Sequence, residues 1–253
     1  MDKEMKVCFV TEAYQSEYVN QFNRKMKELH NILGDDVHYY VSTNLPNKIN
    51  NNYKNLKVFD LSDLQQRSLK TKKYENFNNK KVYSKYPWNL RRHIINKGFE
   101  DGFDYVIWTD CDVLLEKNIT YKKLIKLLAS LEKNTINTNS AIYKFNEDNP
   151  KRMFNNYEKV FKDLDLKFDK NDMVTHDGPT AIYYLDNEHQ KKFIEKWDFM
   201  VSYGYESKYW RDGNWFIPNL IYVILMSGVK VKFLPKKIFI TKHNKENRIT
   251  NEK

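Results

Sequence analysis

Two aspartates one residue apart, Asp110 and Asp112, are the residues of this chain best suited to chemistry. They directly follow an apolar segment, Tyr105 to Trp108, whose aromatic and β-branched side chains predict a buried strand. Carboxylates at the end of a buried strand are costly unless a partner offsets their charge. A divalent cation would do so, because hard cations prefer carboxylate oxygens. The alternative is a simple turn, since Asp is common where strands stop.

A helix expected over residues 87–99 brings two arginines into the same part of the chain. At about 100° per residue, Arg91 falls in the middle of the apolar arc of this helix and Arg92 at its edge. A guanidinium on an inward face needs an anionic partner. Three interpretations stay open: a stem that passes the edge of the core to reach water, an internal salt bridge, and a contact with the phosphate of a ligand.

Three more segments carry residues that suit a binding site. His243 follows the last expected strand, and a neutral imidazole is a good ligand for a borderline cation such as Mn²⁺. Asp212 lies between Trp210 and Trp215, which would make an apolar wall for a ligand; the alternative role of Asp212 is a helix N-cap. Asp177 precedes an expected strand and is most simply part of a turn. Both of these aspartates are candidates for the crevice at the end of an open α/β sheet.

Hydrophobic periodicity predicts the elements that must position these residues. A strand, a helix and a second strand open the chain, which favours a βαβ unit and an open parallel sheet. We expect strands over residues 6–11, 37–42, 56–61, 105–108, 140–145, 179–185, 229–234 and 238–241. We expect helices over residues 16–33, 87–99, 120–131, 151–164, 187–201 and 214–227.

Composition narrows the class of protein. Hydrophobic residues make up 41% of the 253 residues, which is enough for a packed core and argues against global disorder. We find no signal peptide and no apolar run long enough to span a membrane, so we expect a soluble, cytoplasmic protein. The 7 glycines form neither a P-loop nor a dinucleotide fingerprint, so any phosphate binding must rely on metal, Arg and Lys.

The net charge of +10 is unevenly distributed. Residues 47–97 contain 13 Lys or Arg against 3 Asp or Glu, and residues 230–253 contain 8 against 2. Within the first segment, basic residues alternate with aromatic ones between residues 70 and 83, a pattern that suits backbone attraction and base stacking. The charge therefore favours a polyanionic partner, although a solvated lysine-rich surface would have the same composition.

From about residue 6 to residue 244, the arrangement resembles the GT-A glycosyltransferases, which use nucleotide-sugar donors. The segments that carry the resemblance are KVCFVTEAY at the start, YPWNLRRHIINKGFEDGFDYVIWTDCDVLL, DGPTAIYYL, WRDGNWFIPNLI and the late TKHN. The order of these segments is most like that of retaining subfamilies. The resemblance implies a single GT-A-like domain over residues 1–253. Residues 1–112 would form its nucleotide-sugar half, and residues 113–253 its acceptor half with a C-terminal metal-ligand segment.

The resemblance also implies roles for particular residues. Asp110, Asp112 and His243 would bind the Mn²⁺ or Mg²⁺ that holds the donor diphosphate. Thr11 and Tyr14 would contact the nucleotide base, and Arg91 and Arg92 the donor. Asp212 and Asp177 would be the catalytic candidates, with Trp210 at the donor.

These expectations lead to a metal-dependent, retaining glycosyltransferase that uses a nucleotide sugar, with UDP-sugar favoured. The charge favours a hydroxymethylated base in DNA as the acceptor, as in viral DNA modification, and the compartment would then be the host cytoplasm. A glycan such as an anionic lipopolysaccharide, or a small glycoside, is the alternative acceptor. A metal-dependent nuclease and a basic, non-catalytic nucleic-acid-binding protein are the alternatives from other classes.

Overall fold

A seven-stranded sheet forms the centre of the computed structural model of this chain, with the strand order β10-β6-β9-β4-β1-β2-β3. The structure describes residues 5–60, 91–139, 142–144, 160, 162–167, 173–175, 180–206, 216–234 and 238–241. The strands of the sheet are β1 (Val7–Glu12), β2 (His38–Thr43), β3 (Leu56–Asp60), β4 (Tyr105–Thr109), β6 (Thr135–Thr138), β9 (Thr180–Tyr184) and β10 (Lys230–Phe233).

The sheet is mostly parallel. Strands β3, β2, β1 and β4 run parallel to one another, and β10 runs parallel to β6. Strand β9 is antiparallel to both of its neighbours, β4 and β6. Two small sheets pair β5 (Val113–Leu115) with β11 (Phe239–Thr241), and β7 (Ile142–Lys144) with β8 (Met173–Thr175), both antiparallel.

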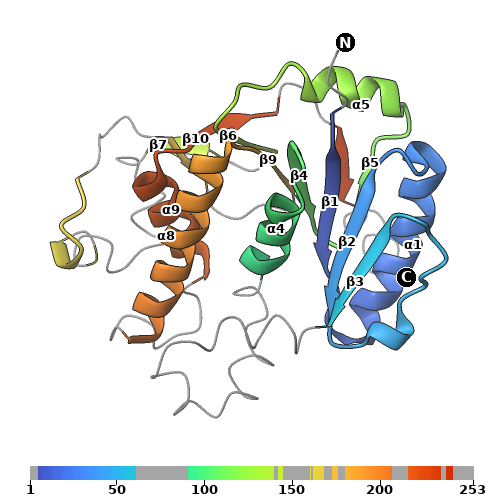
Figure 1. Cartoon of the computed structure of the whole chain (residues 1–253), viewed down its shortest axis with the longest axis horizontal. Coiled ribbons are helices and arrows are strands. Elements are labelled where there is room, and N and C mark those ends of the chain that lie inside the picture. Colours follow the sequence, from blue (N-terminus) through green and yellow to red (C-terminus); the bar gives the residue numbers. More distant parts are fainter. Residues whose placement is uncertain are drawn as a thin grey trace, which may run out of the picture.

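Helices cover both faces of the sheet (Figure 1). Helix α1 (Gln15–Leu33) lies on one face, whose core also includes side chains of α5 (Tyr121–Leu128). Helices α4 (Arg91–Glu100), α8 (Asn187–Glu206) and α9 (Phe216–Ser227) cover the other face. A short 3₁₀ turn, η1 (Pro46–Lys48), lies between β2 and β3.

The alternation of side chains along the central strands decides which residues meet which helix. Val7 and Phe9 of β1 face α1, whereas Cys8 and Val10 face α4. In β4, Tyr105 and Ile107 face α1, whereas Val106 and Trp108 face the other way. Because the side-chain period of a strand is two, the threonines at the ends of both strands lie on the α1 face.

Helix α4 packs against β4 at very close range. A Cβ atom added to Gly98 would lie 2.8 Å from Cγ2 of Val106, which is less than a normal contact distance. Glycine therefore allows the helix backbone to approach the strand. This close packing fixes the helix that carries Arg91 against the strand that leads to Asp110.

The expected α/β class, with an open and mostly parallel sheet between helices, is confirmed. Most expected elements lie within a residue or two of the observed ones. Helix α8 is longer than expected and continues to Glu206, and α4 is described only from Arg91. Sequence analysis missed β5, β6 and β8. The expected helix over residues 151–164 lies mostly outside the described residues. Among the described residues, no helix is long and apolar enough to cross a membrane.

Candidate functional site

The strand order of the sheet reverses between β1 and β4. From β1 the chain continues to β2 and β3 on one side, and it returns to form β4 on the other side of β1. In open α/β sheets, ligands bind outside the carboxyl ends of the strands at such a switch point. Here those ends are Thr11 and Glu12 of β1, and Thr109 of β4 with Asp110 directly after it. The sequence-predicted aspartates therefore lie where the fold favours a ligand.

The turn Asp110-Cys111-Asp112 is held on its core side. Asp110 and Asp112 are half-buried, whereas Cys111 is buried. The Cys111 thiol donates a hydrogen bond to the main-chain oxygen of Glu12 at 2.8 Å, and Val113 N donates to Asp110 O at 3.2 Å. Burial raises the pKa of the Cys111 thiol to about 12. The middle residue of the motif is therefore a neutral anchor, and the two aspartates on either side carry its charge.

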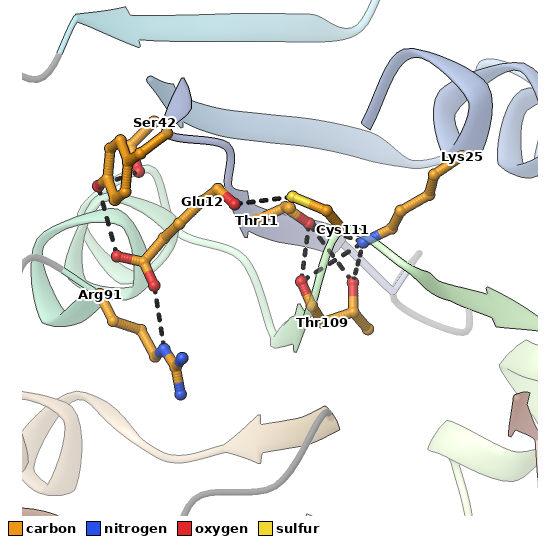
Figure 2. A network of polar contacts seen from close by, with 8 residues as sticks. Thr11, Glu12, Lys25, Ser42, Arg91, Thr109 and Cys111 are labelled. Atoms are coloured by element: carbon orange, nitrogen blue, oxygen red, sulfur yellow. Dashed lines mark hydrogen bonds and ion pairs between the residues drawn. The ribbon is translucent and has the colours of Figure 1, made fainter. Parts of the chain in front are cut away.

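Lys25 of α1 is a buried cation of this site that the sequence did not identify. Its Nζ donates to Thr11 Oγ1 and to Asp110 O, each at 2.8 Å, and also to Thr109 Oγ1. Figure 2 shows the side chain reaching from α1 to both threonines. Burial lowers the pKa of the ammonium from its usual 10.5 to about 8, against the opposing influence of Cys111, Asp110 and Asp112.

A projection of helix α1 contains the signal for Lys25. At about 100° per residue, Lys25 falls roughly 40° outside the arc that runs from Leu29 to Val19 through Phe22 and Met26. A lysine so close to the apolar face requires acceptors inside the protein. The α1-facing threonines at the ends of β1 and β4 provide them.

Arg91 lies on the opposite face of the sheet from Lys25. Its Nε is 3.1 Å from Oε2 of Glu12, and its guanidinium carbon is 3.3 Å from the ring centre of Trp108. Only 2% of the Arg91 side chain and 8% of the Glu12 side chain are exposed, so this ion pair is buried. The internal salt bridge that the sequence left open is therefore present. Glu12 is a second site residue that sequence analysis missed, and Figure 2 shows it between Arg91 and Cys111.

Arg92 is directed toward another helix. Its Nε forms an ion pair with Oδ1 of Asp198 in α8, and only 4% of the Arg92 side chain is exposed. This contact ties α4 to α8. The predicted contact of Arg92 with a donor stays a prediction, because the structure holds no ligand against which it can be tested.

The two residues predicted at the nucleotide base are both in the hydrogen-bond network of the β1 end. Thr11 Oγ1 donates to Thr109 O at 3.0 Å and joins β1 to β4. The Tyr14 hydroxyl lies 2.9 Å from Ser42 Oγ and 3.4 Å from Oε1 of Glu12. Burial, and then the neighbouring Glu12 charge, raise the pKa of Tyr14 well above its usual value. Tyr14 is thus a neutral hydrogen-bonding group.

Four predicted site residues lie outside the described residues: Asp177, Trp210, Asp212 and His243. The described elements next to two of them do reach the site. Thr180, three residues after Asp177, pairs with Thr109 at the end of β4. Thr241, two residues before His243, pairs with Val113, which follows Asp112.

The metal-binding side chains in the described part of the site suit a cation that is also bound by the phosphates of a substrate. Among the described residues there is no group of three His, Cys, Asp or Glu side chains that could hold a metal by itself. The site does supply Asp110 and Asp112. Mg²⁺ is commonly bound by one or two carboxylates together with substrate phosphates and water. The carboxylate pair therefore fits such an ion, and His243 would be a third ligand from outside the described part.

Solved structures include distant structural likenesses to this chain. No protein-family model matches the chain, and no curated protein sequence matches it. The solved apo structure of the bifunctional glycosyltransferase WbbM is similar, with a TM-score of 0.46 and 12% sequence identity. The match covers 93% of this chain and 39% of that protein, so the chain spans about two fifths of its length. The function proposed below depends on the residues of the chain itself and not on this likeness.

Proposed function

We propose that this chain is a metal-dependent glycosyltransferase of GT-A type. It would transfer a sugar from a nucleotide diphosphate sugar, with UDP-sugar favoured, to an acceptor hydroxyl. The observation that carries the proposal is the position of Asp110 and Asp112 at the carboxyl end of β4, beside the switch point at β1. That position suits a nucleotide, and paired carboxylates suit the cation that accompanies a diphosphate.

The chemistry of the transfer explains why these residue types are needed. A diphosphate leaving group gains negative charge as the glycosidic bond breaks. When bound, Mn²⁺ or Mg²⁺ supplies positive charge to that leaving group. Asp110 and Asp112 would hold this ion, and the Arg91 guanidinium pairs with Glu12 at the end of the neighbouring strand β1. The acceptor hydroxyl then needs accurate positioning more than any other form of catalysis.

The remaining roles follow the resemblance. Thr11 and Tyr14 bind the base of the donor, and Arg91 and Arg92 assist with the phosphates. Asp212, with Asp177 as the second candidate, lies at the reacting sugar beside Trp210, and the reaction retains the anomeric configuration. His243 completes the metal site. The pairing of Thr180 with Thr109 and of Thr241 with Val113 supports the roles of Asp177 and His243.

The acceptor half of the proposal depends on charge. Residues 1–112 would bind the donor and residues 113–253 the acceptor. A hydroxymethylated base in DNA is the favoured acceptor because both basic segments adjoin proposed donor residues, Arg91 and His243. An anionic glycan or a small glycoside is the second acceptor class. Transfer to a base in duplex DNA requires that the base is extruded or reached from the major groove.

Donor hydrolysis is the experiment that tests the enzyme class. The protein is incubated with a panel of nucleotide sugars and Mn²⁺, and release of the nucleotide diphosphate is measured. We expect turnover that EDTA abolishes and that Asp112→Asn reduces by about 100-fold or more, with little change in thermal stability. Asp36→Asn changes an exposed aspartate away from the site and is the matched control. Full activity of Asp112→Asn in EDTA would refute the metal site.

Two further measurements resolve the finer parts of the proposal. NMR of the anomeric proton of the product distinguishes retention from inversion. Binding to duplex DNA is measured across a range of salt concentrations, and a DNA acceptor requires a steep loss of affinity with added salt. Transfer only to free oligosaccharides would favour the glycan. Cleavage of plain DNA would favour a nuclease, and DNA binding without donor turnover would favour a non-catalytic binding protein.

A further inference from the structure

Lys25 holds the point where the ends of β1 and β4 meet the Asp110-Cys111-Asp112 turn. Its ammonium has three N–H donors, and three acceptors surround it closely: Thr11 Oγ1, Thr109 Oγ1 and Asp110 O. Thr109 O lies slightly farther away, at 3.4 Å. The first acceptor belongs to β1, and the others belong to β4 and the turn. Only 2% of the residue is exposed, so water does not compete for these bonds.

We propose that Lys25 is a positioning residue that fixes the Asp110-Cys111-Asp112 turn, so that both carboxylates are held in place for a metal ion. The part of this proposal that concerns the metal rests on the proposed function, whereas the effect on the turn does not. Lys25 contacts the main-chain oxygen of Asp110. It would therefore position the Asp110 carboxylate through the main chain without binding the metal itself.

Two described contacts attach the turn to its core neighbours, one from helix α1 and one to strand β1. Lys25 reaches Asp110 O from the α1 face. The Cys111 thiol binds the main-chain oxygen of Glu12, whose side chain pairs with Arg91 of α4. Figure 2 shows the contacts of Lys25 with Thr11 and Thr109, and the contact of the Cys111 thiol with Glu12. Without Lys25, the oxygens of Thr109 and Asp110 would lose a charged donor, whereas the Cys111 attachment would remain.

A charge effect and a positioning effect of Lys25 predict opposite changes in metal affinity when Lys25 is replaced. The proposal can therefore be tested. A buried ammonium beside a cation site repels the cation. If Lys25 were only a nearby charge, its removal would therefore strengthen metal binding. If Lys25 positions the carboxylates, its removal weakens metal binding in spite of the lost repulsion. Replacing a residue that orients a metal ligand typically weakens the metal affinity by about 10- to 100-fold.

The first measurement needs no metal. Lys25→Met keeps an unbranched side chain of similar length, and Lys27→Met, at an exposed position of the same helix, is the matched control. Labelling of the two cysteines with a maleimide is followed at each site by mass spectrometry. We expect Cys111 to react about tenfold faster or more in Lys25→Met because the turn opens locally. Cys8, inside β1, should react as slowly as in the wild type.

The second measurement is the affinity for Mn²⁺, titrated by electron paramagnetic resonance with and without UDP. We expect Lys25→Met to bind Mn²⁺ about 10-fold more weakly or worse, and Lys27→Met to match the wild type. Wild-type or tighter binding by Lys25→Met, together with unchanged labelling of Cys111, would overturn the proposal. If the wild type binds no Mn²⁺, the proposed metal site fails, and the labelling alone decides the role of Lys25.

A second variant covers the case in which Lys25→Met does not fold. Thr109→Val removes one acceptor of the Lys25 ammonium and keeps both the lysine and the shape of the side chain. We expect the same two effects in the same direction, at about threefold. Wild-type labelling and wild-type Mn²⁺ affinity in Thr109→Val would then reject the positioning role.

Discussion

The buried pair of Arg91 and Glu12 leads to a prediction about both stability and donor binding. Replacing one partner leaves the other charge in a site from which water is excluded, and such changes cost about 3–5 kcal/mol. Glu12→Gln retains an acceptor for Nε of Arg91, so we expect about 3 kcal/mol, at the lower limit of that range. For a domain of this size, this corresponds to a melting temperature about 6–12 °C lower.

Arg91→Met adds the loss of the contact with Trp108. The guanidinium carbon lies 3.3 Å from the ring centre, and a desolvated contact of this kind contributes about 1–2 kcal/mol. We expect Arg91→Met to be the more destabilising variant. The double variant should be less destabilised than the sum of the single variants by about 2–3 kcal/mol, because it leaves no isolated charge.

Thermal and urea unfolding of the four proteins measure this coupling, and UDP binding by calorimetry measures its functional side. If Arg91 binds the donor, Arg91→Met weakens UDP binding. Glu12→Gln keeps the Arg91 guanidinium and should leave UDP binding unchanged. Equal UDP affinity in both variants would make Arg91 a structural residue only. Single effects below about 1 kcal/mol that add up in the double variant would show that the pair behaves like an exposed salt bridge, contrary to the argument from burial.

Three further predictions concern stability. Asp186→Ala should cost about 1 kcal/mol in urea unfolding, because its carboxylate accepts from His189 N at the start of α8; an unchanged midpoint would contradict this capping role. Gly98→Ala should cost about 1–3 kcal/mol, since the new methyl group overlaps Val106, and a neutral result would show that α4 can move away. The pKa of Lys25 is lowered on folding, so the unfolded chain binds the extra proton between about pH 8 and 10.5. The stability of wild type relative to Lys25→Met should therefore rise with pH in this window. A fall would mean that folding raises the pKa of Lys25.

The parts of the fold that follow a regular pattern could be predicted from the sequence. Helix α1 has apolar residues at helical spacing and ends at Gly34, which has a φ of 62°. Strand β4 is a continuous buried apolar segment. Strand β6 has neither kind of pattern, because Thr135, Asn137 and Thr138 are polar and yet buried. These residues satisfy their polar atoms inside the sheet, for example Asn137 Nδ2 with Thr135 Oγ1 at 2.7 Å, and the sequence does not reveal such partners.

The candidate site could be predicted only in part, for a related reason. The carboxylates of Asp110 and Asp112 were identifiable because they end a strand. The projection of α1 places Lys25 beside the apolar face, but the partners of Lys25 and Glu12 depend on which strands become neighbours. The switch at β1 brings residues that are about 100 positions apart into contact, such as Thr11 and Thr109. The roles of the predicted residues outside the described part stay predictions.

The pairing of β5 with β11 affects the order in which the site is completed during protein synthesis. Val113, directly after Asp112, pairs with Thr241, which the ribosome adds about 130 residues later. At translation rates of about 5–20 residues per second, this interval lasts roughly 6–26 s. During that time β5 has no strand partner, although β1 and β4 have already been made. We therefore expect the Asp110-Cys111-Asp112 turn to be among the last parts of the nascent chain to reach its final conformation.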